Sequence, residues 1–177
     1  MATIVNLGDS LGHLTYSTLV HPGDTWDEMR SSVTSYGPAV KRIVSPEQPL
    51  AVSLRLSAES AHRLAGDHDE IDEFREFLDE HDLYLLTVNA FPYGPFKGDV
   101  VKERVYEPDW TTSDRTRYTT AVAEVAARLA PAEVQPSIQT APLAFRPKVT
   151  GPAYVASFTR NVLSVVSHLV GIERRDG

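Results

Sequence analysis

Three polar side chains at the ends of predicted β-strands are the residues of this chain best suited to chemistry. His21 precedes a Pro-Gly turn, Arg55 stands near the end of an apolar run, and Asn89 ends the next apolar run. An imidazole titrates near neutral pH and can act as a general base or a metal ligand. A guanidinium keeps its charge and binds phosphate or carboxylate through two hydrogen bonds. An asparagine amide can hydrogen-bond a sugar hydroxyl.

Each of these residues also has a purely structural interpretation. Arg55 could form an ion pair with an Asp or Glu of a neighbouring strand or loop. His21 could cap a turn or face solvent, and Asn89 could satisfy backbone groups of its loop. The residue types alone leave both interpretations open.

Four further residues are candidates for binding a substrate. The segment 89–112 is longer than an ordinary connection between a strand and a helix. In it, Tyr93 could stack on a ring or simply pack the loop, and Lys97 could contact an anionic ligand or stay solvated. Gln139 and Thr140 close the fourth predicted strand and offer polar groups to a pocket.

The elements that must position these residues alternate between strands and helices. Apolar and β-branched runs predict strands over 14–20, 50–56, 83–88 and 134–140. Helical spacing predicts helices over about 26–43 with a kink or break at Gly37-Pro38, over 58–65, 69–80 and 113–129, and from Pro152 to a stop at Gly171. Thr25 and Glu28 form a capping-box pattern that predicts the start of the first helix near Trp26. Such alternation predicts an α/β fold with parallel strands joined by right-handed crossovers.

Each predicted strand pairs an apolar row with a row that becomes polar toward its carboxyl end. The polar rows are Thr15, Ser17, Leu19 and His21; Ala51, Ser53 and Arg55; Leu85, Thr87 and Asn89; and Ser137 and Gln139. Helices would cover the apolar rows, and the polar rows would line a lumen.

A complete (β/α)₈ barrel needs about 250 residues and eight strands, and this chain of 177 residues supplies four. We therefore expect a partial (β/α)₈ TIM barrel of about four βα units, the N-terminal half, with parallel strands and outer helices. Residues 1–177 would form this single domain, with 1–13 as an extended lead-in. The alternatives are association with a second chain that completes or covers the open barrel, and an open doubly wound sheet. The doubly wound sheet is disfavoured because no Gly-rich phosphate turn follows a strand.

Composition narrows the class of partner. The net charge of -7 argues against a nucleic-acid partner, and the lack of cysteine excludes disulfides and thiolate chemistry. No apolar run approaches the roughly 20 residues of a membrane span, and the N-terminus does not resemble a signal peptide. These features fit a cytoplasmic protein without membrane insertion, and they say nothing specific about small ligands.

Several blocks of the chain resemble the metabolite traffic proteins of the EboE type, which belong to the xylose-isomerase-like TIM-barrel (sugar phosphate isomerase/epimerase) superfamily. The blocks that carry the resemblance are Leu11-Gly12-His13-Leu14-Thr15-Tyr16-Ser17-Thr18, His21-Pro22-Gly23, Leu54-Arg55-Leu56-Ser57, Asn89-Ala90-Phe91-Pro92-Tyr93-Gly94, Val105-Tyr106-Glu107-Pro108-Asp109-Trp110, and Ser137-Ile138-Gln139-Thr140-Ala141-Pro142-Leu143. The chain departs from the family pattern at Ser17, Leu19 and Lys97.

The resemblance implies a small polar metabolite, sugar-like or anionic, bound at the carboxyl ends of the strands. If the complete barrel is catalytic, the expected reaction is isomerisation or epimerisation, with a divalent metal polarising vicinal oxygens while a base moves a proton. The superfamily draws its metal ligands from later strands, so we expect none in this chain and the cofactor is open. The expected catalytic residue is His21, and the expected substrate contacts are Arg55, Asn89, Tyr93, Lys97, Gln139 and Thr140. A non-catalytic metabolite-binding or trafficking partner and an inactive truncated barrel are the alternatives, because a fold supports many functions.

Overall fold

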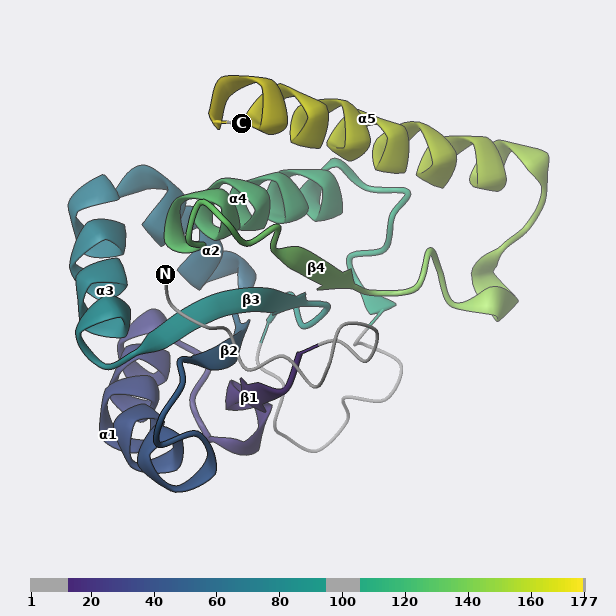
Figure 1. Ribbon diagram of the computed structural model, residues 1–177. Coiled ribbons are helices and arrows are strands. Elements are labelled where there is room, and N and C mark those ends of the chain that lie inside the picture. The colour runs from purple at the N-terminus through teal and green to yellow at the C-terminus, as the bar shows by residue number, and fades with distance from the viewer. Residues whose placement is uncertain (1–12, 95–105, 177) are drawn as a thin grey trace.

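A computed structural model describes residues 13–94 and 106–176, which form one four-stranded sheet and five α-helices (Figure 1). The strands are β1 (Thr15–Ser17), β2 (Leu50–Arg55), β3 (Leu83–Ala90) and β4 (Ser137–Thr140). The helices are α1 (Trp26–Val44), α2 (Ala58–Gly66), α3 (His68–Glu80), α4 (Ser113–Leu129) and α5 (Pro152–Asp176). The predicted α/β alternation is confirmed.

The strands lie in chain order, β1-β2-β3-β4, and every neighbouring pair is parallel. Their carboxyl ends therefore meet at one edge of the sheet. At that edge Arg55 of β2 pairs in register with Asn89 of β3, and Asn89 pairs with Gln139 of β4.

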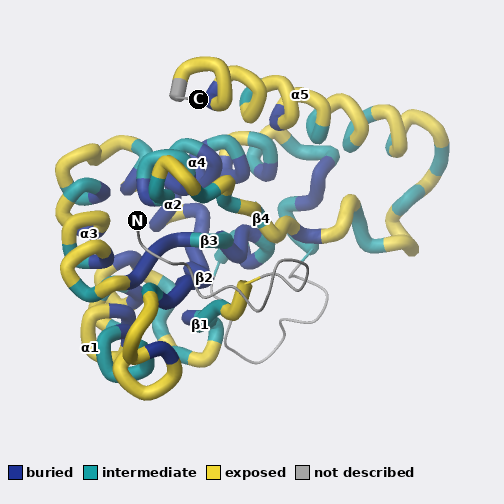
Figure 2. Tube along the Cα trace, viewed as in Figure 1, coloured by how far each residue is buried: buried dark blue, intermediate teal, exposed yellow. Residues whose placement is uncertain are grey.

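One face of the sheet carries the core of the molecule. The alternating residues Leu50, Val52 and Leu54 of β2 are fully buried there, and residues of α1, α2, α3 and α4 join the same hydrophobic cluster. Figure 2 shows this buried interior between the sheet and the helices, while α5 is largely exposed. The helices α1 to α4 therefore all cover the same face of the sheet.

A β-bulge in β3 corrects the predicted polar row of that strand. Leu85 pairs with Val52, but the next pair joins Thr87 to Ser53, so Leu86 is an extra residue. A bulge of one residue reverses the alternation of side chains along a strand. Leu85 consequently belongs to the buried core, while Thr87 and Asn89 remain on the face shared with Ser53.

The first strand is shorter than predicted. It ends at Ser17 and gives way to a 3₁₀ turn over Thr18–Val20. The Ser17 side chain caps this turn, since its Oγ accepts the Leu19 amide at 3.4 Å. The buried hydroxyl of Thr18 accepts the backbone N–H of Arg55 at 2.9 Å. Leu19 and His21 therefore follow the strand and are not part of its polar row.

The helix α1 is continuous through Pro38, so of the predicted kink or break the break does not occur. Its first turn is closed by the predicted capping box, in which the side chains of Thr25 and Glu28 bond each other's backbone amides. Gly37 is the point of closest approach to the sheet, since an added Cβ would lie 3.0 Å from Leu83 Cδ1. We infer that packing of the buried face offsets the hydrogen bond lost at proline, which alone costs about 3 kcal/mol.

The helix α5 also runs beyond its predicted end and continues past Gly171. Ile172 is buried, and the Arg175 guanidinium donates to Glu124 of α4 at 2.9 Å, so the last turn is anchored to its neighbour. Over Pro152–Arg175, α5 is long and apolar enough to cross a membrane by length and composition alone. The sequence analysis did not single out this segment, because polar residues interrupt its apolar run.

Candidate functional site

The carboxyl edge of the sheet brings three of the predicted site residues side by side. Arg55, Asn89 and Gln139 are consecutive cross-strand partners. The Asn89 amide donates to Ser53 Oγ at 2.9 Å, and both residues are buried. Gln139 and Thr140 are exposed at the end of β4. Because Thr140 is adjacent to Gln139 along the strand, its side chain lies on the opposite face.

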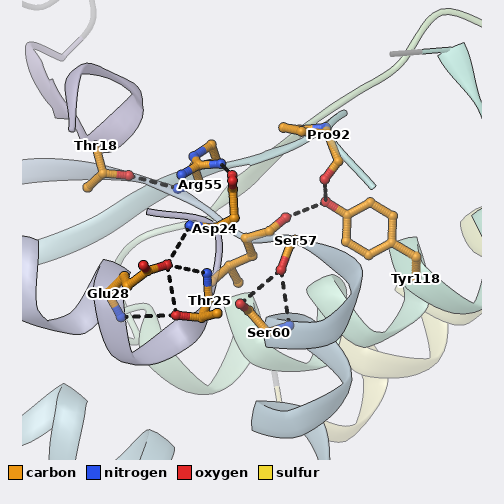
Figure 3. A network of polar contacts seen from close by, with 10 residues as sticks. Thr18, Asp24, Thr25, Glu28, Arg55, Ser57, Ser60, Pro92 and Tyr118 are labelled. Atoms are coloured by element: carbon orange, nitrogen blue, oxygen red, sulfur yellow. Dashed lines mark hydrogen bonds and ion pairs between the residues drawn. The ribbon is translucent and has the colours of Figure 1, made fainter. Parts of the chain in front are cut away.

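Arg55 is the most constrained of these side chains, since only 3% of it is exposed. Its Nη1 donates to the Asp24 carboxylate at 2.5 Å (Figure 3). Its Nη2 is buried and has no hydrogen-bond partner within the described part of the chain. The structural ion pair is thus present, yet it uses one side of a guanidinium that can hold a second oxyanion.

The loop before α1 holds the Asp24 carboxylate in place. Glu28 Oε2 accepts the backbone N–H groups of Asp24 and Thr25 at 2.9 and 3.1 Å, as Figure 3 shows. The Thr25 and Asp24 amides, followed by the Thr25 hydroxyl and the charge of Arg55, lower the pKa of Glu28. The capping box therefore fixes Asp24 opposite Arg55 and adds a second negative charge near it.

His21 contacts two aromatic side chains, those of Tyr16 and Tyr36. Its Nε2 hydrogen-bonds the Tyr16 hydroxyl, and its ring stacks on Tyr36 of α1 with centroids 4.5 Å apart. Tyr16 pairs with Val52 and packs against the hydrophobic core, so it points to the helix-covered face. Burial, followed by the nearby Tyr36, raises the pKa of Tyr16, which keeps its hydroxyl protonated. These contacts draw His21 toward α1, whereas Arg55 and Asn89 belong to the opposite row of the sheet.

Tyr93 packs the loop that follows β3. Its ring meets Tyr118 of α4 edge-on at 5.4 Å, and its carbonyl accepts the N–H of Ala58 at 2.9 Å. The packing interpretation of Tyr93 therefore has direct contacts in its favour. Lys97 lies outside the described residues.

Arg115 was missed by sequence reasoning. It is fully buried, its Nε donates to Pro108 O at 2.8 Å, and its Nη1 donates to Ala90 O and Phe91 O at 3.1 and 3.2 Å. The guanidinium thereby fixes the carboxyl end of β3 to the first turn of α4. The sequence contained one indication that Arg115 is buried: its spacing places it on the same helical face as Tyr118 and Val122.

The Tyr-x-Pro-Asp-Trp block, one of the most distinctive motifs of the sequence, holds α5 in place. Asp109 accepts hydrogen bonds from the Thr111 amide at 2.9 Å and from the Tyr154 hydroxyl of α5. The Trp110 indole donates to Ala141 O at 3.2 Å, and Asn161 of α5 donates to Trp110 O at 2.8 Å. This block therefore connects α4, the segment after β4, and α5.

Asp109→Asn is expected to lower the free energy of unfolding by about 1–3 kcal/mol at pH 7, the cost of a mispaired buried polar group. Burial opposes ionisation of Asp109, but hydrogen bonds from Thr111 and Tyr154 outweigh it and lower its pKa. Because the folded-state pKa is lowered, the ionised carboxylate stabilises the fold above its unfolded-state pKa of about 3.9 and that contribution disappears as the pH falls through the folded value. Urea unfolding at pH 7 and pH 3 should therefore show a smaller gap between wild type and variant at pH 3.

The matched control is Asp114→Asn, which removes a carboxylate from an exposed ion pair with Arg117. Its effect should stay within about 0.5 kcal/mol at both pH values. A gap between wild type and Asp109→Asn that is equally wide at pH 3 would contradict the assigned role of the carboxylate.

Among residues 13–94 and 106–176, no three His, Asp or Glu side chains gather so as to hold a metal ion. The residues described thus do not fit the divalent metal of a sugar isomerase. Comparison of the chain with family models, with curated proteins and with solved structures found no match.

Proposed function

We propose that this chain forms half of a xylose-isomerase-like barrel of the EboE type and binds a small anionic metabolite at the carboxyl ends of its strands. The order of the strands supports the half-barrel. In a doubly wound sheet the order reverses and helices cover both faces. Here the order runs β1-β2-β3-β4 without reversal, and α1 to α4 share one face. Both observations support a barrel wall over a doubly wound sheet.

The unpartnered Nη2 of Arg55 is the single observation that carries the binding proposal. A buried guanidinium nitrogen without an acceptor is costly, and an oxyanion would satisfy it. Arg55 stands at the edge where ligands gather in parallel α/β folds. Asn89 and Gln139 beside it supply amide groups suited to hydroxyls of the same ligand.

Binding is favoured over catalysis by the placement of the polar groups. The described residues do not form a metal site, and the contacts of His21 with Tyr16 and Tyr36 keep it with α1. A metabolite-binding or trafficking role needs only the anion contact and its neighbouring amides. We therefore propose binding as the function, and isomerase or epimerase chemistry would require residues beyond those described.

Two substitutions with opposite effects test the proposal by calorimetric titration with inorganic phosphate and a pentose phosphate. Arg55→Met should weaken binding at least tenfold, which corresponds to about 1.4 kcal/mol. Asp24→Asn should tighten binding several-fold, because it removes the negative charge that shares the guanidinium with the ligand. Asp24 is partly exposed, so this variant is expected to fold.

Arg30→Met is the matched control, since Arg30 is a partly exposed arginine paired with Glu73 on the outer helices. It should leave the affinity unchanged. Equal affinity in wild type, Asp24→Asn and Arg55→Met would overturn the assignment of Arg55. Circular dichroism of each variant separates loss of binding from loss of fold.

A further inference from the structure

The described sheet has two open edges, β1 and β4. Each has a neighbour on one side only, so each leaves backbone N–H and C=O groups without strand partners on the other. Proteins usually cover such an edge or pair it with another strand. The helices that follow the two edge strands indicate what pairs with these edges.

At the β4 edge, α5 turns an apolar face away from the rest of the molecule. The side of α5 that contacts α4 is marked by the buried Val165 and Ile172. Apolar side chains on the remaining surface stay exposed; Leu163 is the most exposed of them at 58%, followed by Val166, Val155, Leu169 and Val170. Figure 2 shows α5 as a largely exposed helix on the outer side of α4. Leu163 and Val170 lie roughly opposite Val165 at about 100° per residue, so they point away from α4.

At the β1 edge, α1 carries a corresponding apolar face. Arg30 of α1 bonds Glu73 of α3 at 3.2 Å, which marks the side of α1 that faces the later elements. Tyr36 and Ile43 lie on the other side of the buried Val33, toward β1, and Ile43 is 81% exposed. The helices that follow the two edge strands, α1 after β1 and α5 after β4, therefore both carry exposed apolar side chains.

We propose that a second copy of this chain occupies both edges. The partner's β1 would add to β4 as a parallel strand, and the partner's α1 would pack against the exposed face of α5. A two-fold axis along the strands makes the second junction identical to the first, so four strands from each copy close a ring of eight. This inference rests on the half-barrel geometry of the proposed function.

The positions of the apolar side chains along the two helices agree with this pairing. Both helices run back from the carboxyl edge of the sheet, so in the closed ring they are parallel to each other. Leu163 lies 11 residues after the start of α5, and Tyr36 lies 10 after the start of α1. Val170 and Ile43 lie 18 and 17 residues after the same points. Exposed apolar side chains thus occur at similar distances from the starts of the two helices.

A second copy accounts for more of the surface than a lipid bilayer does. A membrane would cover α5 and leave the two strand edges and Ile43 unpaired. A second copy covers all four features with one symmetric contact made twice. It also places two sets of Arg55, Asn89 and Gln139 around one lumen, so the ligand site would be shared.

The test is sedimentation equilibrium of the chain, whose mass is 19.5 kDa. Wild type should sediment at twice this mass, and the double variant Ile43→Glu with Leu163→Glu should sediment as a monomer. Both positions are exposed, so the variant is expected to fold. The control Ser164→Glu changes an exposed residue on the polar side of α5 and should stay dimeric. A monomeric wild type would overturn the proposal, as would a double variant that remains a dimer.

Cross-linking checks the pairing itself, because the chain has no cysteine of its own. A mixture of Ile43→Cys and Val170→Cys chains should form a disulfide between copies on oxidation, and a mixture of Ile43→Cys and Ser164→Cys should not. Equal linking in both mixtures would overturn the pairing.

Flotation with vesicles of neutral and anionic phospholipid tests the membrane as the alternative occupant of α5. A monomer that binds vesicles would favour a membrane over a second copy. Phosphate titration of the same samples separates the two proposals, since a monomer that still binds through Arg55 refutes only the dimer.

Discussion

Arg115→Met is expected to lower the free energy of unfolding by about 3–5 kcal/mol, a large part of the 5–15 kcal/mol of a typical domain. The guanidinium of Arg115 is fully buried and donates to three backbone carbonyls, those of Ala90, Phe91 and Pro108. Methionine fills much of the volume and donates nothing, and each buried carbonyl left unpaired costs about 1–3 kcal/mol. Relief of the buried charge offsets part of this loss.

Urea unfolding followed by circular dichroism measures this effect. Arg117→Met, two residues further along α4, is the matched control because Arg117 is exposed and pairs only with Asp114 in the described structure. The control should change stability by less than about 0.5 kcal/mol. If both variants unfold at the same urea concentration, Arg115 does not fasten β3 to α4.

Phe74→Ala is expected to lower the free energy of unfolding by about 3–5 kcal/mol, the range for truncating a buried aromatic ring. Phe74 of α3 has no exposed surface and meets the Trp26 ring of α1 edge-on at 4.9 Å. Its removal leaves a cavity between two helices and the sheet and ends this aromatic contact, which adds about 0.5–1.5 kcal/mol beyond burial.

Phe77→Ala on the same helix provides the comparison, since Phe77 is only partly buried. Its loss should cost clearly less than that of Phe74. The two variants unfold in the same assay, and Trp26 fluorescence reports the packing around position 74 directly. A larger loss for Phe77 than for Phe74 would contradict the assignment of Phe74 to the core.

The elements set by local sequence were predictable. The Thr25–Glu28 capping box starts α1 as predicted, and period-2 and period-3.6 patterns located the four strands and five helices. The exceptions depend on contacts between distant residues. Pro38 is tolerated in α1 because the helix packs on β3 at Gly37. No sequence pattern within 26–44 predicts that contact.

The candidate site likewise has one part that the sequence predicts and another part that depends on contacts between distant residues. The juxtaposition of Arg55 and Asn89 follows from parallel strands whose polar rows end together, and the register shows it. The bulge that moves Leu85 into the core depends on pairing between β2 and β3, which a single strand does not reveal. The place of His21 depends on Tyr36, which belongs to another element.

Arg115 and Asp109 show how charged residues were underestimated. Both were absent from the sequence-based candidates, yet both are buried and join separate elements. The Nε and Nη1 groups of Arg115 donate to backbone carbonyls that come from other parts of the chain. The sequence alone does not show which carbonyls will accept these hydrogen bonds.

The central claim is that the Arg55 guanidinium offers its Nη2 to an anion at the carboxyl edge of the sheet. Side-chain ¹H–¹⁵N NMR of the arginine guanidinium groups during titration with inorganic phosphate tests it most directly. The resonances of Arg55 should shift to saturation, at lower phosphate in Asp24→Asn than in wild type, while those of Arg30 stay in place. Arg55 resonances that do not move while exposed arginines shift without saturation would contradict the claim.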